Sequence, residues 1–281
     1  MQRSQRLKTR PSHLAIAAAL LVSACAPTTH TDAVIGGGAD TMLRVGDAAR
    51  DAGDIGAAIP IYRRAHALAP LESAPLLRLA NSLHTIGAYR EAGNAWDRIL
   101  RLESKNFEAR VGYGETLLAL GQPILALEEF NLPSKHGKNA KMYNGVGLAN
   151  DMLGKPKLAQ AAYREGLQKA RTANLLNNIG LSLALSGESE DAIALLEETA
   201  KTSATGPQHR SNLALAYLVS GNSGRAAELL ARDMDDVSMI RTIAFYETII
   251  ALPDHARKVA AMGASGQRKT ALSTQNARAA R

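Results

Sequence analysis

Residues 77–96 read LRLANSLHTIGAYREAGNAW. A small residue, Ala80, lies seven positions before Gly87, and Ala92 and Trp96 follow that glycine by five and nine positions. Glycine tolerates positive φ and ends helices, whereas Ala92 and Trp96, four residues apart, share one face of a helix. The stretch therefore predicts two closely packed helices joined by a turn at Gly87.

The same spacing occurs six times along the chain. The turn glycines are Gly53, Gly87, Gly121, Gly154, Gly187 and Gly221. The small residues before them are Gly46, Ala80, Gly114, Gly147, Gly180 and Ala214. The residues after them are the pairs Ala58 and Tyr62, Ala92 and Trp96, Ala126 and Phe130, Ala159 and Tyr163, Ala192 and Leu196, and Ala226 and Leu230. This period resembles the tetratricopeptide repeat over residues 39–234. Because no single unit can bury its apolar face alone, we predict an all-α, right-handed superhelical solenoid of about six repeats.

Two segments depart from the repeat. In the third repeat, Pro123 and Pro133 bracket a short second helix, and residues 131–139 are expected to form an irregular connection. After residue 233 the register stops. Residues 237–252 still predict a helix, which Pro253 ends. Its residues at helical spacing are Ile240, Ile243, Ala244 and Ile250. We expect this helix to cap the solenoid.

The N-terminus has the layout of a secretory signal, with four basic residues before an uncharged apolar run over residues 14–22. Residues 21–25 read LVSAC and resemble a bacterial lipobox, in which the cysteine is lipidated. Cys25 is the only cysteine in the chain. We expect residues 1–24 to be a lipoprotein signal peptide, Cys25 to be the lipidation site, and residues 25–38 to be a flexible tether. Ala26 follows the cysteine where an Asp favours inner-membrane retention, so we expect an outer-membrane anchor that leaves the protein facing the periplasm.

The formal net charge of +7 is unevenly distributed. Residues 1–24 contain four basic residues and no acid, and residues 254–281 contain six basic residues and one acid. The segment between them is close to neutral, with 23 basic and 25 acidic residues. The excess therefore belongs to the signal and to residues 254–281, which we expect to be a basic, disordered tail. No basic face is left on the body for nucleic acid.

The sequence contains no pattern that predicts catalysis, a cofactor or a metal site. Gly112-Tyr113-Gly114 and Gly145-Val146-Gly147 resemble pieces of a dinucleotide fingerprint. Both lie inside first helices of repeats, where close helix packing explains them. No histidine pair has the spacing of a zinc protease. The histidines are His13, His30, His66, His84, His136, His209 and His255. We expect a protein without enzyme activity.

The first helices of such repeats line the concave face, which is the expected binding surface. Its N-terminal end is charged and polar, with Asp40, Leu43, Asp47, Arg50, Leu77, Asn81 and His84. Asp151 belongs to the same face in repeat four. The peptide groove is predicted from Asn144, Leu148, Asn174, Asn177, Leu181, Leu185, Ser211, Leu215 and Leu218. Asparagine amides can pair with a peptide backbone, and leucines can receive apolar anchors. Packing of some of these leucines against neighbouring helices is the alternative.

The last two repeats carry a more specific resemblance. Residues 177–187 read NNIGLSLALSG, residues 210–217 read RSNLALAY, and residues 226–233 read AAELLARD. This run resembles the TadD-like lipoproteins of Flp (tight adherence) pilus assembly. Members often continue with an Asn-Val-Ala-Tyr-like helix, whereas residues 241–246 here read RTIAFY.

The resemblance implies a pilotin-like accessory that binds the pilus secretin or another assembly component. A general repeat adaptor in envelope assembly, unrelated to pili, is the alternative function.

Overall fold

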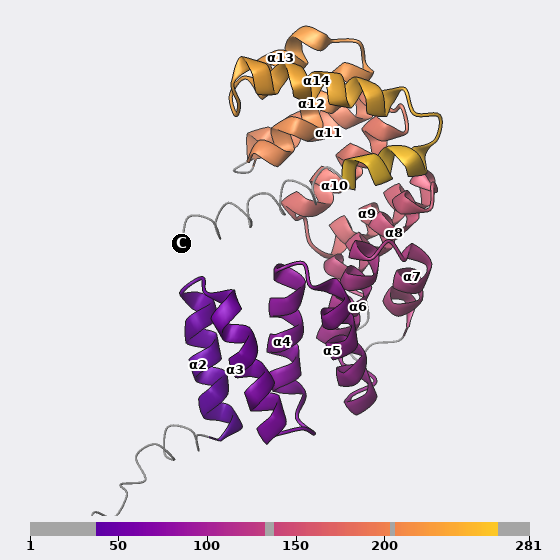
Figure 1. The fold of residues 1–281 in the computed structure, drawn as a ribbon. Coiled ribbons are helices and arrows are strands. Elements are labelled where there is room, and N and C mark those ends of the chain that lie inside the picture. Colours follow the sequence, from indigo (N-terminus) through magenta and orange to yellow (C-terminus); the bar gives the residue numbers. More distant parts are fainter. Residues whose placement is uncertain (1–37, 133–137, 203–205, 264–281) are drawn as a thin grey trace, which may run out of the picture. The chain divides into compact units, whose positions relative to one another are not determined.

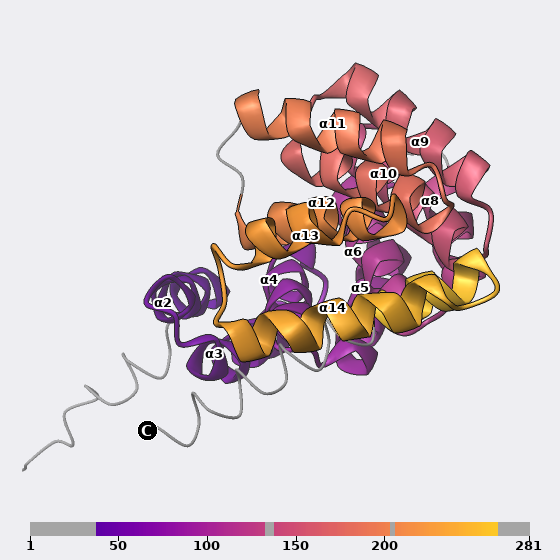
Figure 2. The same cartoon turned by 90° about the horizontal axis from the view of Figure 1, so that it is seen from above.

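The computed structural model describes residues 38–132, 138–202 and 206–263. This part of the chain consists of helices and connecting turns, with no strand (Figure 1). The helices are α2 (Ala39–Asp51), α3 (Ile55–Leu68), α4 (Ser73–Thr85), α5 (Tyr89–Leu102), α6 (Phe107–Ala119), α7 (Pro123–Asn131), α8 (Ala140–Met152), α9 (Pro156–Lys169), α10 (Ala173–Leu185), α11 (Ser189–Thr202), α12 (Pro207–Val219), α13 (Ser223–Leu230) and α14 (Asp236–Ile250). Helices α2 to α13 form six consecutive pairs, each packed on the next, so the predicted all-α repeat solenoid is confirmed (Figures 1 and 2).

Local residues define where these helices begin and turn. The side chain of Asn106 accepts a hydrogen bond from the Ala109 backbone N–H at 2.9 Å, and Asn139 caps α8 in the same way at 3.0 Å. These caps satisfy donors that a helix leaves unpaired. All six predicted turn glycines have positive φ, between 72° and 89°. The predicted turns are therefore confirmed.

The repeated alanine and large apolar positions form the interior. Every one of them in the six pairs is at most 1% exposed. The small residues of the first helices leave space for the aromatic rings of the second helices. A Cβ placed on Gly112 would lie 2.4 Å from Trp96, and one on Gly145 would lie 2.3 Å from Phe130. Both glycine pairs therefore serve helix packing, as expected from their place in the repeat.

The third repeat has the predicted short second helix. Helix α7 begins at Pro123 and ends at Asn131, after nine residues. Most of the expected irregular connection lies in residues 133–137, which are outside the described residues. Helix α8 then restores the repeat at Ala140.

Helix α14 confirms the predicted helix after the last repeat but presents a different face to the solenoid. Tyr246 and Ile249 are buried against α12 and α13, whereas Ile240 is 63% exposed and Ala244 is exposed. The predicted apolar face is therefore wrong at Ile240 and Ala244. The helix is apolar on several sides, and only contact with its neighbours selects the side that is buried.

The chain continues beyond the predicted end of its folded body. Residues 255–263 are helical and lie next to α10 (Figure 1). The Asp254 side chain caps this segment by accepting from the Arg257 backbone N–H at 2.8 Å. The expected disordered tail is therefore wrong for these residues, because an Asp cap and a short apolar face offset their basic charge.

Several predictions concern residues outside the described ranges. They are the signal peptide, the lipidation site Cys25, the tether up to residue 37, and the tail from residue 264. Within the described ranges, no helix combines the length and the apolar character needed to cross a membrane.

Candidate peptide-binding groove

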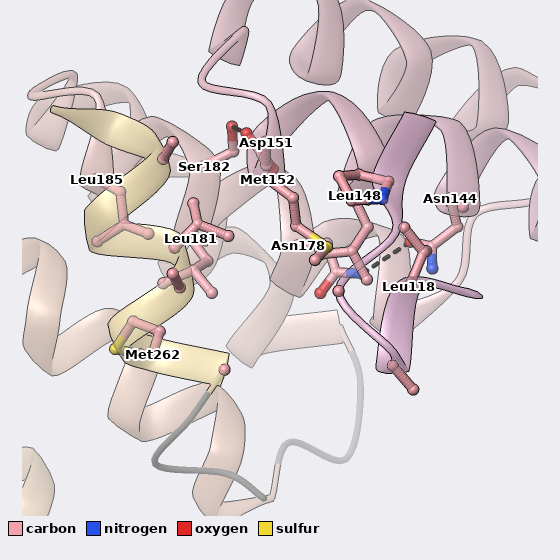
Figure 3. A pocket seen from close by; sticks show the side chains of 18 of the residues that line it. Leu118, Asn144, Leu148, Asp151, Met152, Asn178, Leu181, Ser182, Leu185 and Met262 are labelled. Atoms are coloured by element: carbon pink, nitrogen blue, oxygen red, sulfur yellow. Dashed lines mark hydrogen bonds between the residues drawn. The ribbon is translucent and has the colours of Figure 1, made fainter. Parts of the chain in front are cut away.

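A cavity of about 840 Å³ lies between the first helices of repeats four and five (Figure 3). Helix α8 contributes Asn144, Leu148, Asp151 and Met152, and α10 contributes Asn178, Leu181, Ser182 and Leu185. The end of α6, the following turn, Pro123, Tyr163 of α9 and Gln208 of α12 also line the solenoid side. Residues 255–263 form the remaining wall. The cavity combines apolar side chains with a few polar groups, which is the composition expected of a binding site.

Asp151 is one of the polar residues that line this cavity and is only 4% exposed. Its Oδ2 accepts a hydrogen bond from the Tyr163 hydroxyl at 2.9 Å. Its Oδ1 accepts from the Ser182 hydroxyl at 2.6 Å and from Nε2 of His255 at 2.8 Å. A buried carboxylate requires such donors because it has lost its water. Two of these donors come from the repeats, and the third comes from the C-terminal segment.

The electrostatic environment of this cluster keeps the hydroxyl of Tyr163 protonated, so that it can donate a hydrogen bond. Burial, the charge of Asp151 and the hydrogen bond to it raise the pKa of Tyr163 well above its ordinary value. The hydroxyl therefore retains its proton at neutral pH. Tyr163 also fills the large apolar position of the fourth repeat, so one side chain both packs the repeat and orients Asp151.

Four of the predicted groove residues line the cavity, namely Asn144, Leu148, Leu181 and Leu185. The amide oxygen of Asn144 accepts a hydrogen bond from Nδ2 of Asn178 at 2.8 Å. Asn178 and Ser182 were missing from the prediction, although they lie on the same helical face as Leu181 and Leu185. Spacings of three and four residues in α10 were the signal that could have identified them.

Two predicted asparagines lie elsewhere. Asn174 is exposed at the start of α10 and does not line the cavity. Oδ1 of Asn177 lies 2.7 Å from Nδ1 of His209, whose Nε2 is 2.8 Å from the backbone oxygen of Leu196. Burial lowers the pKa of His209 below its ordinary value. Asn177 therefore supports the packing of α12 in this structure.

The remaining predicted groove residues are covered by α14. Leu215 is 0% and Leu218 9% exposed, and both belong to the apolar cluster that contains Tyr246. Ser211 hydrogen-bonds the Tyr246 hydroxyl. The expectation that these three residues face a ligand is therefore corrected. They receive the capping helix, because an open apolar face at the end of a solenoid must be covered.

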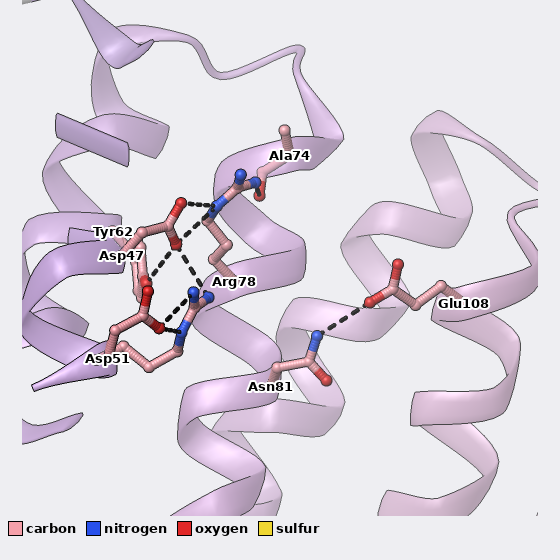
Figure 4. Close-up of polar contacts among 8 residues, drawn as sticks. Asp47, Asp51, Tyr62, Ala74, Arg78, Asn81 and Glu108 are labelled. Carbon is pink, nitrogen blue, oxygen red and sulfur yellow. Dashed lines mark hydrogen bonds and ion pairs between the residues drawn. The ribbon is translucent and has the colours of Figure 1, made fainter. Parts of the chain in front are cut away.

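The N-terminal end of the concave face is a network of paired charges (Figure 4). Asp47 accepts hydrogen bonds from the Tyr62 hydroxyl at 2.8 Å and from Nε of Arg78 at 2.9 Å, and it lies 3.0 Å from Nη1 of Arg50. Nδ2 of Asn81 donates to Glu108 at 3.1 Å. Of the polar residues predicted for this end, Asp47 and Arg50 therefore pair with each other, and Asn81 pairs with Glu108.

The network also affects proton binding. Burial alone raises the pKa of Asp47, but the hydrogen bonds from Arg78 and Tyr62 and the nearby arginine charges outweigh it, so the pKa lies below the ordinary value. Burial and the hydrogen bond to Asp47 raise the pKa of Tyr62 to about 12. At neutral pH Asp47 therefore stays a carboxylate that accepts hydrogen bonds, and Tyr62 stays a hydroxyl that donates one.

The described residues contain no group of three or more His, Cys, Asp or Glu side chains that could hold a metal ion. The cavity instead offers leucine side chains, an amide pair and the carboxylates of Asp151 and Glu115. Such a set can bind a peptide through apolar anchors and hydrogen bonds.

Comparison with solved structures supports the repeat architecture. PilW, described as a widely conserved type IV pilus biogenesis factor, matches with a TM-score of 0.63 at 15% identity, over 73% of this chain and 98% of PilW. A tetratricopeptide repeat protein from Parabacteroides merdae matches with a TM-score of 0.61 at 15% identity, over 74% of this chain and 84% of that protein. A chain of the APC/C hetero-tetramer Cut9–Hcn1 matches with a TM-score of 0.63 at 18% identity, over 74% of this chain but only 43% of its own length. No protein-family model and no curated protein matches the sequence. The similarities show a tetratricopeptide-repeat fold, shared with PilW and other repeat proteins.

Proposed function

We propose that this chain is a non-enzymatic, lipid-anchored scaffold that acts like a pilotin in Flp (tight adherence) pilus biogenesis. Its partner is a peptide segment of the secretin or of another assembly component. The lipobox around Cys25 and the TadD-like run in the last repeats support this role. The fold similarity to PilW, a pilus biogenesis factor, is consistent with it.

The cavity between α8 and α10 is the observation that carries the proposal. Leu148 of α8 and Leu181 of α10 are half-buried in the cavity lining, where they can hold apolar side chains of a peptide. The hydrogen-bonded amides of Asn144 and Asn178 lie beside them and can pair with a peptide backbone. Binding at such a site needs no catalytic group.

Charging the two leucines tests the binding role. We expect Leu148→Asp together with Leu181→Asp to reduce capture of the secretin from solubilised membranes at least about tenfold, because each buried charge opposes an apolar anchor. Co-purification followed by immunoblotting measures the capture.

The matched control is Leu158→Asp, at a position that is 57% exposed on α9 and outside the cavity. It should capture the secretin as the unaltered chain does. Undiminished capture by the double variant would contradict the groove assignment. Capture of an envelope protein from outside the pilus system, with no secretin, would instead favour the general adaptor.

The anchor requires a separate test. We expect Cys25→Ala to move the protein from the outer-membrane fraction to the soluble periplasm, because the acyl chains that provide stable anchoring would have no acceptor. Fractionation and labelling with a fatty-acid analogue measure this. Unchanged labelling and unchanged membrane association in the variant would refute lipidation at Cys25.

A further inference from the structure

The segment 255–263 lies in the proposed peptide site itself. Its His255 donates to Asp151, and Nζ of Lys258 lies 3.4 Å from the backbone oxygen of Leu185, at the end of α10. Val259 and Met262 pack against the apolar cluster that includes Leu185. His255, Val259 and Met262 are spaced by four and three residues, so they share one face of the short helix. The segment contacts the site as a helical peptide ligand would.

The attachment of this segment differs from that of the capping helix. Helix α14 buries Tyr246 and Ile249, whereas residues 255–263 are all at least partly exposed. Nine residues are also too few for a stable isolated helix, since isolated helices shorter than about 12 residues are marginal in water. The segment therefore depends on the groove for its structure, while the groove has its own core.

The polar contact between His255 and Asp151 also allows a ligand to replace the segment. The His255 side chain is 8% exposed, and its Nδ1 is buried without a hydrogen-bond partner among the described residues. An unpaired buried nitrogen costs free energy. Asp151 keeps its hydrogen bonds from Tyr163 and Ser182 when the segment leaves, because both come from the repeats. The vacated site then presents an oriented carboxylate that needs one more donor.

The site is larger than the segment that it holds. The cavity of about 840 Å³ extends from the segment along α8 and α10 to the end of α6. Ala256, Val259 and Ala260 form one wall of it, and Leu148 and Leu181 lie on the solenoid side. A ligand with larger apolar side chains can therefore make contacts that the alanines of this segment do not make.

We propose that the groove between α8 and α10 binds a short amphipathic helix and that residues 255–263 occupy it in the resting chain. The partner helix carries a His, Lys or Arg donor for Asp151, with apolar side chains four and seven positions later. It binds by displacing the chain's own segment. The inference rests on the proposed peptide site but not on the pilus role, so the test uses no pilus protein.

The probe is a fluorescent synthetic peptide with the sequence of residues 252–263, titrated against the full chain. In the unaltered chain the attached segment competes at an effective concentration in the millimolar range, so the peptide binds weakly. Val259→Asp with Met262→Asp in the chain disables that competitor. We expect this variant to bind the unaltered peptide at least about tenfold more tightly, as measured by fluorescence anisotropy.

The matched control places the same charges on the outer side of α14. Val237→Asp with Ile240→Asp alters residues that are 57% and 63% exposed and do not line the cavity. It should bind the peptide as weakly as the unaltered chain. A peptide with His255→Ala should lose most of its affinity for the open variant. Equal binding of the unaltered peptide to all three proteins would overturn the proposal.

A second measurement needs no variant and therefore tests the proposal even if the double variant does not fold. Excess heavy-isotope peptide is added to the unaltered chain, and amide hydrogen exchange is followed by mass spectrometry. Exchange should accelerate in the chain's own residues 257–263 and stay unchanged in α14, because only the short segment is displaced. Unchanged exchange in both regions at saturating peptide would refute displacement. Acceleration in both would equally refute it, because it would mean that the C-terminal helices open together.

Discussion

Gly147→Ala will lower the free energy of unfolding by about 3 kcal/mol, through overpacking that the core cannot relieve. The new Cβ would lie 2.3 Å from Cε1 and 2.6 Å from Cζ of Tyr163, whose ring is fully buried. The ring has little freedom to move aside, because its hydroxyl is hydrogen-bonded to Asp151. Guanidinium denaturation followed by circular dichroism measures the loss.

Gly93→Ala is the matched control, since this glycine is also buried inside a helix. A Cβ there would meet Tyr113 at 3.7 Å and Thr116 at 3.8 Å, which are ordinary contacts. Alanine is favoured over glycine in helices by about 1 kcal/mol, so the control should be at least as stable as the unaltered chain. Adding Tyr163→Leu to Gly147→Ala should restore part of the stability by removing the ring. Equal stability of the two alanine variants would show that the ring can shift.

Asp151→Ala is the second substitution with a large expected effect, a destabilisation of about 3 kcal/mol. The change removes the acceptor of three hydrogen bonds at once, from Tyr163, Ser182 and His255. The Tyr163 hydroxyl is then buried without that partner. Residues 255–263 also lose their polar contact with α8. Thermal and chemical unfolding measure the first effect, and hydrogen exchange in residues 257–263 measures the second.

Two comparisons separate this effect from a general loss of charge. Asp151→Asn keeps a side-chain oxygen as an acceptor and should cost less than Asp151→Ala. Asp97→Ala removes an exposed acid paired with Arg101 at 2.7 Å and should change stability by less than about 1 kcal/mol, as surface ion pairs contribute little. An Asp151→Ala variant as stable as Asp97→Ala would contradict the role of the buried cluster.

Most of the fold was predictable from local spacing. The residues around Gly87, with Ala80 before it and Ala92 and Trp96 after it, predict a pair of packed helices that recurs with the same geometry. Each pair packs mainly on its immediate neighbours. A pattern within about 20 residues therefore contains most of the information that the architecture requires. The short α7 was predictable for the same reason, from its flanking prolines.

The site was predicted only in part. Asn144, Leu148, Leu181 and Leu185 line the cavity because the first helix of each repeat always turns the same face inward. The same rule predicted that Leu215 lines the groove, but this residue is covered by α14. Position in a repeat specifies which side of the helix a residue occupies. It does not specify what covers that side at the end of the array.

The sequence by itself determined the repeat number, the turn positions and the large buried apolar residue of each unit, because these depend on contacts between neighbouring segments. Only the tertiary structure revealed what lies in the groove. The bond from His255 to Asp151 joins residues 104 positions apart that belong to no common period. An Asp cap and an apolar face could indicate a helix at residues 255–263, but the surface that receives it depends on the shape and charge of the assembled repeats. Long-range contacts of this kind have no local signature, because both partners must be folded before the contact exists.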